Sequence, residues 1–301
     1  MEVLDSCLLC GYRGPFGFYM NCQDTLVSEE FFQIASCPQC NFLFTNPRPL
    51  ITEISEYYRS ANYISHKDAP SGIKEKLYHL VKRRMLKNKL RLLKKYTTRE
   101  QRQILDFGCG TGDFVVAASH HGFAASGYEP DKHAGTLAKE KGVAVLNNAG
   151  ELENLPSGSF DVVTMWHVLE HLHHPDQTLE MLEKLLTNDG LLFVAAPMAN
   201  CADAEYYLAS WAAYDVPRHL FHFTPRSLTR LAEKKGFSLI ERKPLYYDAY
   251  YISLLSEQYL NQGKTSALTP FKAFYRGSQS NIKARITKRP ASSEIFVFKK
   301  K

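Results

Sequence analysis

The stretch Leu105-Asp106-Phe107-Gly108-Cys109-Gly110-Thr111-Gly112-Asp113 decides the fold of this 301-residue chain. It follows an apolar run and precedes a helical pattern, so we expect it to connect a strand to a helix. Its alternate glycines allow a tight turn and a close approach of ligand to backbone, because no Cβ intervenes. A dinucleotide loop of the GxGxxG kind would need a third glycine where Asp113 stands, and the GxxxxGK[ST] phosphate loop is absent. The sequence therefore predicts a loop for a ligand other than a pyrophosphate.

Outward from this loop, apolar runs alternate with helical stretches as far as about Ile240. The runs expected to be strands are QILDF, FAASGYE, VAVLN, FDVVTMW and LLFVAAP, and EIFVFKK is expected to form a last strand. The helix DQTLEMLEKLLTNDG is expected to stop at Asn188-Asp189-Gly190. This alternation predicts an α/β fold, with a mostly parallel sheet covered by helices on both faces.

The spacing D-x-G-x-G-x-G resembles the first motif of the Rossmann-like (class I) S-adenosylmethionine-dependent methyltransferases. The later motifs of that family are matched in order as far as about residue 245. The second is an acid at a strand end, Glu129, which stands 23 residues beyond Asp106. The resemblance implies that Asp106 faces the ammonium of the cofactor and that Glu129 accepts hydrogen bonds from its ribose.

Two further segments resemble the third and fourth motifs of that family: Gly150-Glu151-Leu152 and the segment that ends in Trp166-His167. In the family, the former flanks the adenine and the latter lines the floor of the cofactor site. The residues implied to bind S-adenosylmethionine are Asp106, Gly108, Gly110, Gly112, Glu129, Glu151, Leu152, Trp166 and His167.

Two CxxC pairs stand near the N-terminus, Cys7-x-x-Cys10 and Cys37-x-x-Cys40. Each pair can supply one knuckle of a tetrahedral thiolate site, which suits a structural Zn²⁺ with no open position. The 26 residues between the pairs exceed the usual loop of about 15 to 20 residues. The segment from Cys37 to Pro49 resembles the zinc-ribbon-like module of bacterial sugar C- and O-methyltransferases, which implies a small-molecule, sugar-nucleotide or glycan-type acceptor.

The segment from Tyr214 to Pro225 follows the fifth predicted strand, at the edge of the sheet where ligands bind. It resembles the acceptor loop of those sugar methyltransferases, in which a histidine is the base. His219 is the first candidate for that base, His222 the second, and Tyr214 a further catalytic candidate, while Arg218 is a candidate for binding an anionic group. Nearby, His171 lies four residues after His167, but no third metal ligand is evident from the sequence.

The sequence divides into a zinc module (1–50), a helical linker or lid (51–100) and a methyltransferase domain (101–301) with an extension from about 250. Residues 74–95 and 261–301 each hold ten Lys and Arg and a single acid, in a chain of net charge +6. Such stretches favour a solvated surface or an anionic partner.

The predicted activity is methylation of a hydroxyl, or a carbon, on a small-molecule or glycan-type acceptor. The alternatives are an RNA methyltransferase and a non-catalytic protein that keeps the cofactor fold. The sequence lacks the [DNS]-P-P-[YFW] tetrad of amino-nitrogen methylators, and neither Cys109 nor Cys201 stands in the context of a nucleophile. Without a signal peptide or a long apolar run, a cytoplasmic protein with reduced thiols is expected.

Overall fold

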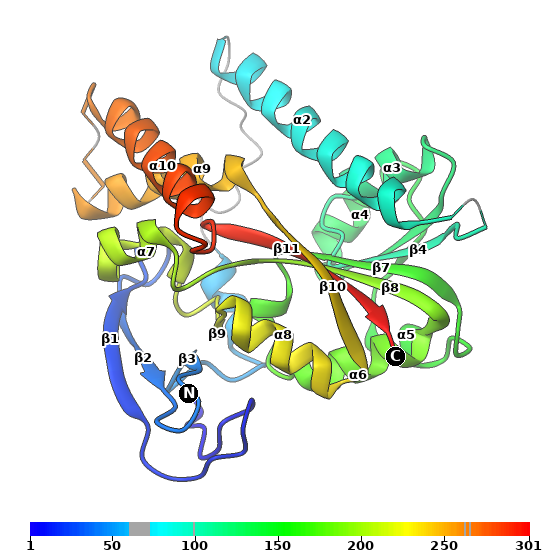
Figure 1. Ribbon diagram of the computed structural model, residues 1–301, viewed down its shortest axis with the longest axis horizontal. Helices are drawn as coiled ribbons and strands as arrows, with labels where there is room; N and C mark the ends of the chain where they lie inside the picture. The colour runs from blue at the N-terminus through cyan, green and yellow to red at the C-terminus, as the bar shows by residue number, and fades with distance from the viewer. Residues whose placement is uncertain (60–72, 99, 262, 265) are drawn as a thin grey trace.

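The computed structural model describes residues 1–59, 73–98, 100–261, 263–264 and 266–301. A seven-stranded sheet dominates it, with the order β10-β11-β8-β7-β4-β5-β6 (Figure 1). Its strands are β4 (Gln103–Phe107), β5 (Ala124–Tyr128), β6 (Val145–Leu146), β7 (Phe160–Trp166), β8 (Leu186–Pro197), β10 (Phe237–Pro244) and β11 (Ser293–Lys300).

Strands β4 to β8 pair in parallel, whereas β11 pairs antiparallel with both β8 and β10. The chain leaves β4 for β5 on one side and later returns to β7 on the other side. The carboxyl ends of β4 and β7 therefore form a topological switch point, which is where open α/β sheets bind ligands. The last strand was predicted from Ile295 to Phe298, and these side chains are buried in β11 between two neighbours.

Helices cover both faces of this sheet, as the sequence predicts. Leu90 and Leu93 of α2 (Ile73–Tyr96) pack with α3 (Asp113–Ser119) on one face, and α6 (Pro175–Leu185) and α8 (Pro225–Lys234) cover the other (Figure 1). The remaining α-helices of the described chain are α4 (Lys132–Glu140), α5 (Ala149–Glu153), α7 (Ala202–Tyr207), α9 (Tyr246–Leu260) and α10 (Thr269–Ile286).

The predicted stop of the helix at residues 188–190 is wrong, because α6 ends at Leu185 and β8 begins at Leu186. The register between β7 and β8 shifts at this point, so Asn188-Asp189-Gly190 forms an irregularity inside a strand. Gly190 is required there, since a Cβ would lie 2.8 Å from Leu186 Cβ and from the Thr187 carbonyl oxygen. A turn signal alone does not distinguish a helix end from a strand bulge.

The N-terminal residues form a second sheet of order β1-β2-β3-β9. Its first three strands are β1 (Gly17–Gln23), β2 (Phe31–Ser36) and β3 (Leu43–Thr45), and the fourth, β9 (Phe221–His222), comes from the predicted acceptor loop. The β1–β2 hairpin occupies most of the chain between the two CxxC pairs, which accounts for their wide spacing.

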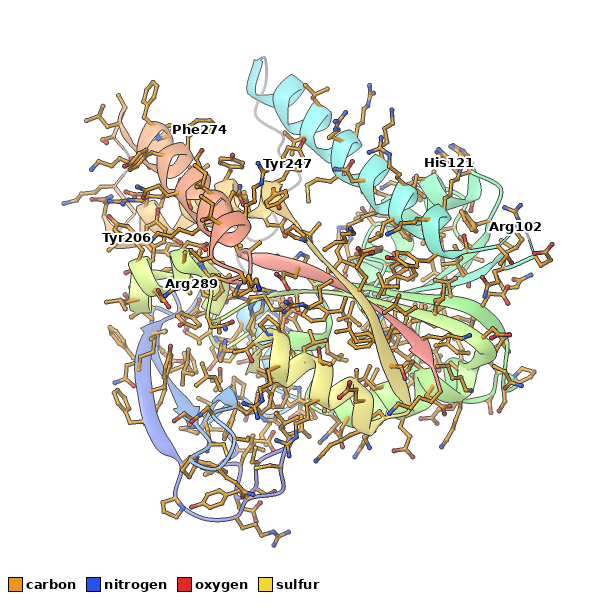
Figure 2. The ribbon with its side chains drawn as sticks, viewed as in Figure 1. Arg102, His121, Tyr206, Tyr247, Phe274 and Arg289 are labelled. Atoms are coloured by element: carbon orange, nitrogen blue, oxygen red, sulfur yellow. The ribbon has the colours of Figure 1, made fainter. Side chains whose placement is uncertain are left out.

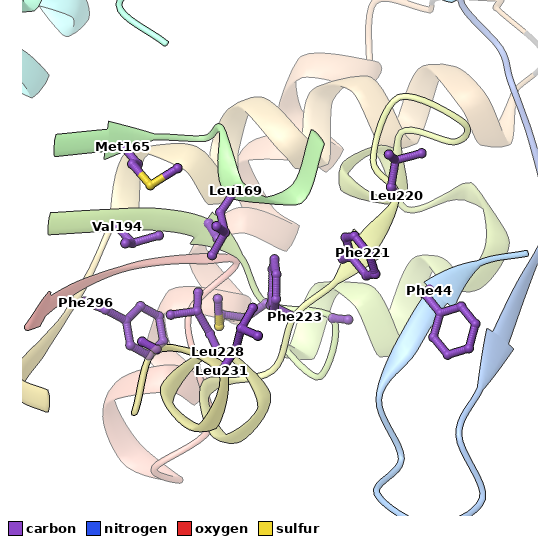
Figure 3. Packing of buried hydrophobic residues seen from close by; sticks show 14 of the residues in the cluster. Phe44, Met165, Leu169, Val194, Leu220, Phe221, Phe223, Leu228, Leu231 and Phe296 are labelled. Atoms are coloured by element: carbon purple, nitrogen blue, oxygen red, sulfur yellow. The ribbon is translucent and has the colours of Figure 1, made fainter. Parts of the chain in front are cut away.

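One hydrophobic core joins the two sheets (Figure 3). Met165 and Val194 of the large sheet pack toward Leu228 of α8, and the cluster continues through Phe221 to Phe44 of the N-terminal sheet. Phe42 stacks on Phe221 with ring centroids 5.7 Å apart. The domain boundary at residue 50 stays a prediction, but it does not coincide with a break in the core.

Candidate functional site

The glycine loop is held at the carboxyl end of β4 by its backbone. Gly108, Gly110 and Gly112 all have positive φ angles (76°, 53° and 77°), which other residues rarely adopt. A Cβ on Gly108 would lie 2.5 Å from Val168, whereas a Cβ on Gly110 would meet nothing within 4 Å. Gly110 therefore presents open backbone of the kind that a ligand approaches closely.

Two acids lie at the ends of β4 and β5 beside this loop. Glu129 accepts hydrogen bonds from the backbone nitrogens of Gly110 (2.8 Å) and Asp131 (2.9 Å), and burial raises its pKa. Asp106 is 2 % exposed and accepts a 2.6 Å hydrogen bond from the Thr164 hydroxyl. Burial raises the pKa of Asp106 to about 7. The structure thus places both predicted acids at the glycine loop.

The other predicted cofactor residues lie along the same edge of the sheet. Asn148 caps the start of α5 by accepting a hydrogen bond from the Glu151 N–H, and the Glu151 carboxylate accepts from the Asn147 N–H and the Asn148 side-chain amide. Leu152 is buried. Trp166 packs against Phe114. Its indole nitrogen is buried and has no hydrogen-bond partner among the described residues.

Sequence reasoning missed Lys89, whose ammonium lies 4.3 Å above the Trp166 ring. It reaches this edge from α2. Burial lowers the pKa of Lys89, and the nearby carboxylates of Asp106 and Asp248 oppose that shift only in part. The one sequence signal for Lys89 was the helical periodicity of residues 74–95, which predicts the helix that carries it.

His167 follows β7 directly and has a positive φ of 58°. Its Nε2 lies 3.1 Å from Asp248 Oδ2, and its Nδ1 lies 3.5 Å from Glu170 Oε1. Burial disfavours the charged ring, but the two carboxylates outweigh burial and raise the pKa of His167 to about 9. The ring is therefore an imidazolium at neutral pH.

A cavity of about 1080 Å³ opens beside His167. Its walls come from the N-terminal hairpin, α2, the loop after β8 and α9. The polar side chains that line it are Gln23, Thr25, Glu29, His167, Asp215, His219, Asp248, Tyr251, Gln258, Tyr259 and Ser293.

His219 contributes to the wall of this cavity, as does Asp215. His219 Nδ1 lies 2.9 Å from the Ala213 carbonyl oxygen, which can only accept, so this nitrogen carries the proton. The other ring nitrogen, Nε2, lies 3.8 Å from Asp215 Oδ2. A neutral His219 thus has its lone pair on Nε2.

A family model described as "Methyltransferase domain" matches residues 77–242, more than half of the chain. This chain belongs to the methyltransferase domain family. Its fold and motifs are those of an S-adenosylmethionine-dependent methyltransferase of the Rossmann-like class, as the sequence predicts.

Among known relatives, the ubiquinone biosynthesis O-methyltransferase of Agrobacterium fabrum is 29% identical over 56% of this chain and 72% of its own length. The enzyme of that name from Caulobacter vibrioides is 34% identical over 31% of this chain and 39% of its own length. A solved S-adenosylmethionine-dependent methyltransferase from Archaeoglobus fulgidus superposes with a TM-score of 0.51 at 17% identity, covering 80% of this chain and all of that one. The last comparison concerns the fold alone.

In this methyltransferase, the three histidine and tyrosine candidates do not share one site. His222 is buried in β9, with Nε2 3.1 Å from the Thr45 hydroxyl, and burial lowers its pKa to about 3. Tyr214 is buried against Trp211 and the His222 ring. Neither lines the large cavity, whereas His219 does.

Arg218 does not have the role that the sequence suggested. Its guanidinium is 1 % exposed and bonds Asp24 (2.9 Å), Asp215 (2.7 Å) and the Tyr57 carbonyl oxygen (3.0 Å). An anionic ligand would have to displace these buried partners. Arg218 instead ties the acceptor loop to the N-terminal hairpin.

Glu170, His171 and His219 form a cluster that the sequence analysis missed. Their ligand atoms lie within 4.8 Å of one another, and the buried Glu170 carboxylate has a 3.5 Å ion-pair contact with His167 but no hydrogen bond of normal geometry among the described residues. Burial opposes the charge of Glu170, but His167 and His219 outweigh it and hold its pKa below the usual range. One carboxylate and two imidazoles suit a divalent cation of the first transition series. The sequence analysis considered His171 together with His167 as a possible metal-binding pair, whereas the structure groups His171 with Glu170 and His219.

The four cysteines of the N-terminal pairs also come together. Cys7 Sγ lies 3.6 Å from Cys40 Sγ, and Cys10 Sγ lies 3.5 Å from Cys37 Sγ. Tetrahedral zinc thiolate sites with Zn–S bonds of about 2.3 Å have sulfur atoms about 3.8 Å apart, so the quartet fits the ion.

The two CxxC turns repeat one backbone pattern. The residue after each pair, Gly11 or Asn41, has a positive φ and donates its N–H to the carbonyl of the first cysteine. This repeat explains why glycine and asparagine follow the two pairs in the sequence.

Proposed function

We propose that this enzyme transfers a methyl group from S-adenosylmethionine to a hydroxyl of a neutral small-molecule acceptor held in the large cavity, with His219 as the base. His167 supports the proposal because it directly follows β7, at the edge of the sheet that carries the glycine loop, and also lines the cavity. A cofactor on the glycine loop and an acceptor in the cavity would therefore be neighbours. The two relatives described above are both O-methyltransferases, which supports a hydroxyl acceptor.

The single observation that carries the choice of base is the hydrogen bond from His219 Nδ1 to the Ala213 carbonyl. It fixes the tautomer that has a lone pair on Nε2, and Asp215 lies on that side to stabilise the imidazolium formed by proton transfer. His167 is already protonated at neutral pH, so it is a poor base. Asp106, Glu129 and the glycines would hold S-adenosylmethionine, which would supply the electrophilic methyl group, and in-line alignment would remove much of the barrier.

The charge of the cavity narrows the class of acceptor. Its described lining contains the acids Glu29, Asp215 and Asp248 and no Lys or Arg. Apolar walls come from Ile252 and Leu255 of α9. Two of these acids are already paired, Asp248 with His167 and Asp215 with Arg218. Because the described lining offers no unpaired cation to a phosphate or carboxylate, a neutral hydroxylated acceptor is favoured over a sugar nucleotide.

RNA is a weaker candidate, because three cations of the basic helix are engaged within the protein itself. Lys82 pairs with Asp113 (2.7 Å), Lys89 lies over Trp166, and Lys95 pairs with Glu241 (2.8 Å). The N-terminal module likewise packs against the acceptor loop through β3 and β9.

The test begins with transfer of a labelled methyl group to fractionated small-molecule, glycan and RNA pools, followed by kinetics on the acceptor found. We expect His219→Ala to lower turnover by about 10²- to 10⁴-fold and to leave cofactor affinity within about twofold. His222→Gln is the matched control and should retain turnover in the folded fraction. Normal turnover by a folded His219→Ala protein would remove this residue from the mechanism, and cofactor binding without any transfer would favour a non-catalytic protein.

The cluster of Glu170, His171 and His219 makes it necessary to compare activity with and without an added divalent cation. If His219 acts as the base, activity of the zinc-loaded enzyme should not depend on added Mg²⁺ or Mn²⁺. Activity that requires such a cation, and is lost in Glu170→Gln, would show that Glu170, His171 and His219 hold a metal that activates the hydroxyl instead.

A further inference from the structure

Helix α10 presents an apolar stripe that no described part of the chain covers. Six large apolar side chains on this helix and just before it are each more than half exposed: Leu268, Phe271, Phe274, Tyr275, Ile282 and Ile286. Isolated exposed apolar residues are common, but a contiguous group of this size marks an interaction site.

The positions of these residues follow the helical period. Five of the six are separated by steps of three, four, seven and four residues, which places them on one side of the helix. The opposite side packs on α7 and α9: Ser280 donates a 2.7 Å hydrogen bond to Asp203, and a Cβ on Gly277 would lie 2.8 Å from Tyr250. The core therefore uses one face of α10 and leaves the apolar stripe outward.

The segment that carries the stripe has charge of one sign, although Arg289 at its end pairs with Glu205 of α7. Residues 261–289 contain seven Lys and Arg and no Asp or Glu. Four of these cations belong to α10, and two lie over aromatic rings: Arg276 is 3.7 Å from the Tyr206 ring and Arg285 is 4.4 Å from the Tyr246 ring. Figure 2 shows Phe274, Tyr206 and Arg289 on the outer side of α7 and α10.

We propose that α10 docks this protein on the surface of an anionic lipid bilayer. The apolar stripe would enter the boundary between headgroups and acyl chains, while the cations on its flanks would meet anionic headgroups. A second copy of this chain would place one group of seven cations against another, and a nucleic acid would leave the apolar stripe in water. No helix of the described chain is long and apolar enough to cross a membrane, so the contact lies on the surface.

This inference is independent of the proposed acceptor, but it has a consequence for the cavity. Tyr251 and Tyr259 of α9 line the cavity, and α9 packs along α10. A bilayer bound to α10 would therefore lie close to the α9 wall of the acceptor site.

The experiment is co-sedimentation of the full chain with phosphatidylcholine vesicles, with and without about one third phosphatidylglycerol. We expect binding to the anionic vesicles only, weakened by salt, and a drop of about tenfold or more in the Phe271→Ser, Ile286→Ser double variant. Val3→Ser with Ile51→Ser is the matched control, because these side chains are similarly exposed in the N-terminal region (74% and 63%). Lys272→Glu with Lys283→Glu tests the charge without touching the stripe.

Three outcomes would overturn the proposal. The first is absence of binding to anionic vesicles at low salt, and the second is equal binding by the double variant and its control. The third is a concentration-dependent dimer that the double variant abolishes while lipid binding is absent, since the stripe would then be a contact between copies of the chain.

Discussion

At the scale of the residue, substitution of Glu129 is the most direct test of the proposed cofactor site beside the glycine loop. We expect Glu129→Ala to weaken binding of S-adenosylhomocysteine by about 10- to 100-fold, because loss of the expected contact between this carboxylate and the ribose would cost about 1.5 to 3 kcal/mol in total. Titration calorimetry measures this. Glu140→Ala on the exposed end of α4 is the control, and equal affinities of the two variants would contradict the role assigned to Glu129.

His222 gives a second prediction at this scale, for stability against pH. Burial lowers its pKa from 6.5 to about 3, so the fold holds the ring neutral while the unfolded chain takes up a proton below about pH 6.5. Stability from this residue is therefore present above about pH 6.5 and lost as the pH falls. Between about pH 7 and about pH 5.5, wild type should lose about 1 kcal/mol more unfolding free energy than His222→Gln. Urea unfolding at the two pH values measures the difference, and parallel losses would contradict it.

At the scale of the element, the two CxxC knuckles should hold about one Zn²⁺ per chain. Removal of the metal should loosen β1 to β3, and with them β9, because β3 pairs with β9 through Leu43 and Phe44. We therefore expect zinc-free protein to lose methyl transfer while the glycine loop still binds the cofactor. Elemental analysis measures the zinc content, and titration calorimetry measures cofactor binding by the zinc-free protein.

Cysteine variants distinguish loss of a zinc ligand from loss of a buried side chain. Cys37→Ala should lose the zinc, whereas Cys22→Ala should keep it, although both side chains are buried in the same module. Protein purified under reducing conditions with no metal would count decisively against the site.

At the scale of the whole molecule, the buried pair Asp24–Arg218 joins the N-terminal hairpin to the acceptor loop (2.9 Å). Asp24→Asn should destabilise the protein by about 3 to 5 kcal/mol, since it leaves a buried cation with one carboxylate fewer. Chemical denaturation gives the value, and Asp24→Asn with Arg218→Met should recover part of the loss. A change within about 0.5 kcal/mol would show that the pair does not couple the two parts.

Local patterns in the sequence determined the elements whose geometry depends on near neighbours. The glycine spacing predicted the turn after β4, the CxxC pairs predicted two knuckles, and Thr224-Pro225 predicted the start of α8, where Thr224 caps the helix. These features follow from the allowed φ and ψ angles and from hydrogen bonds between residues a few positions apart.

The tertiary structure alone decided which of the candidate side chains face the cavity. His219 and His222 differ by three positions, yet one lines the cavity and the other is buried because β9 pairs with β3. Arg218 was assigned to a ligand because its partner Asp24 lies 194 residues away in the chain, and no local pattern signals such a contact. The burial and charge of a side chain depend on what the whole topology packs against it, so Glu170, Lys89 and the uncovered face of α10 became apparent only in the folded chain.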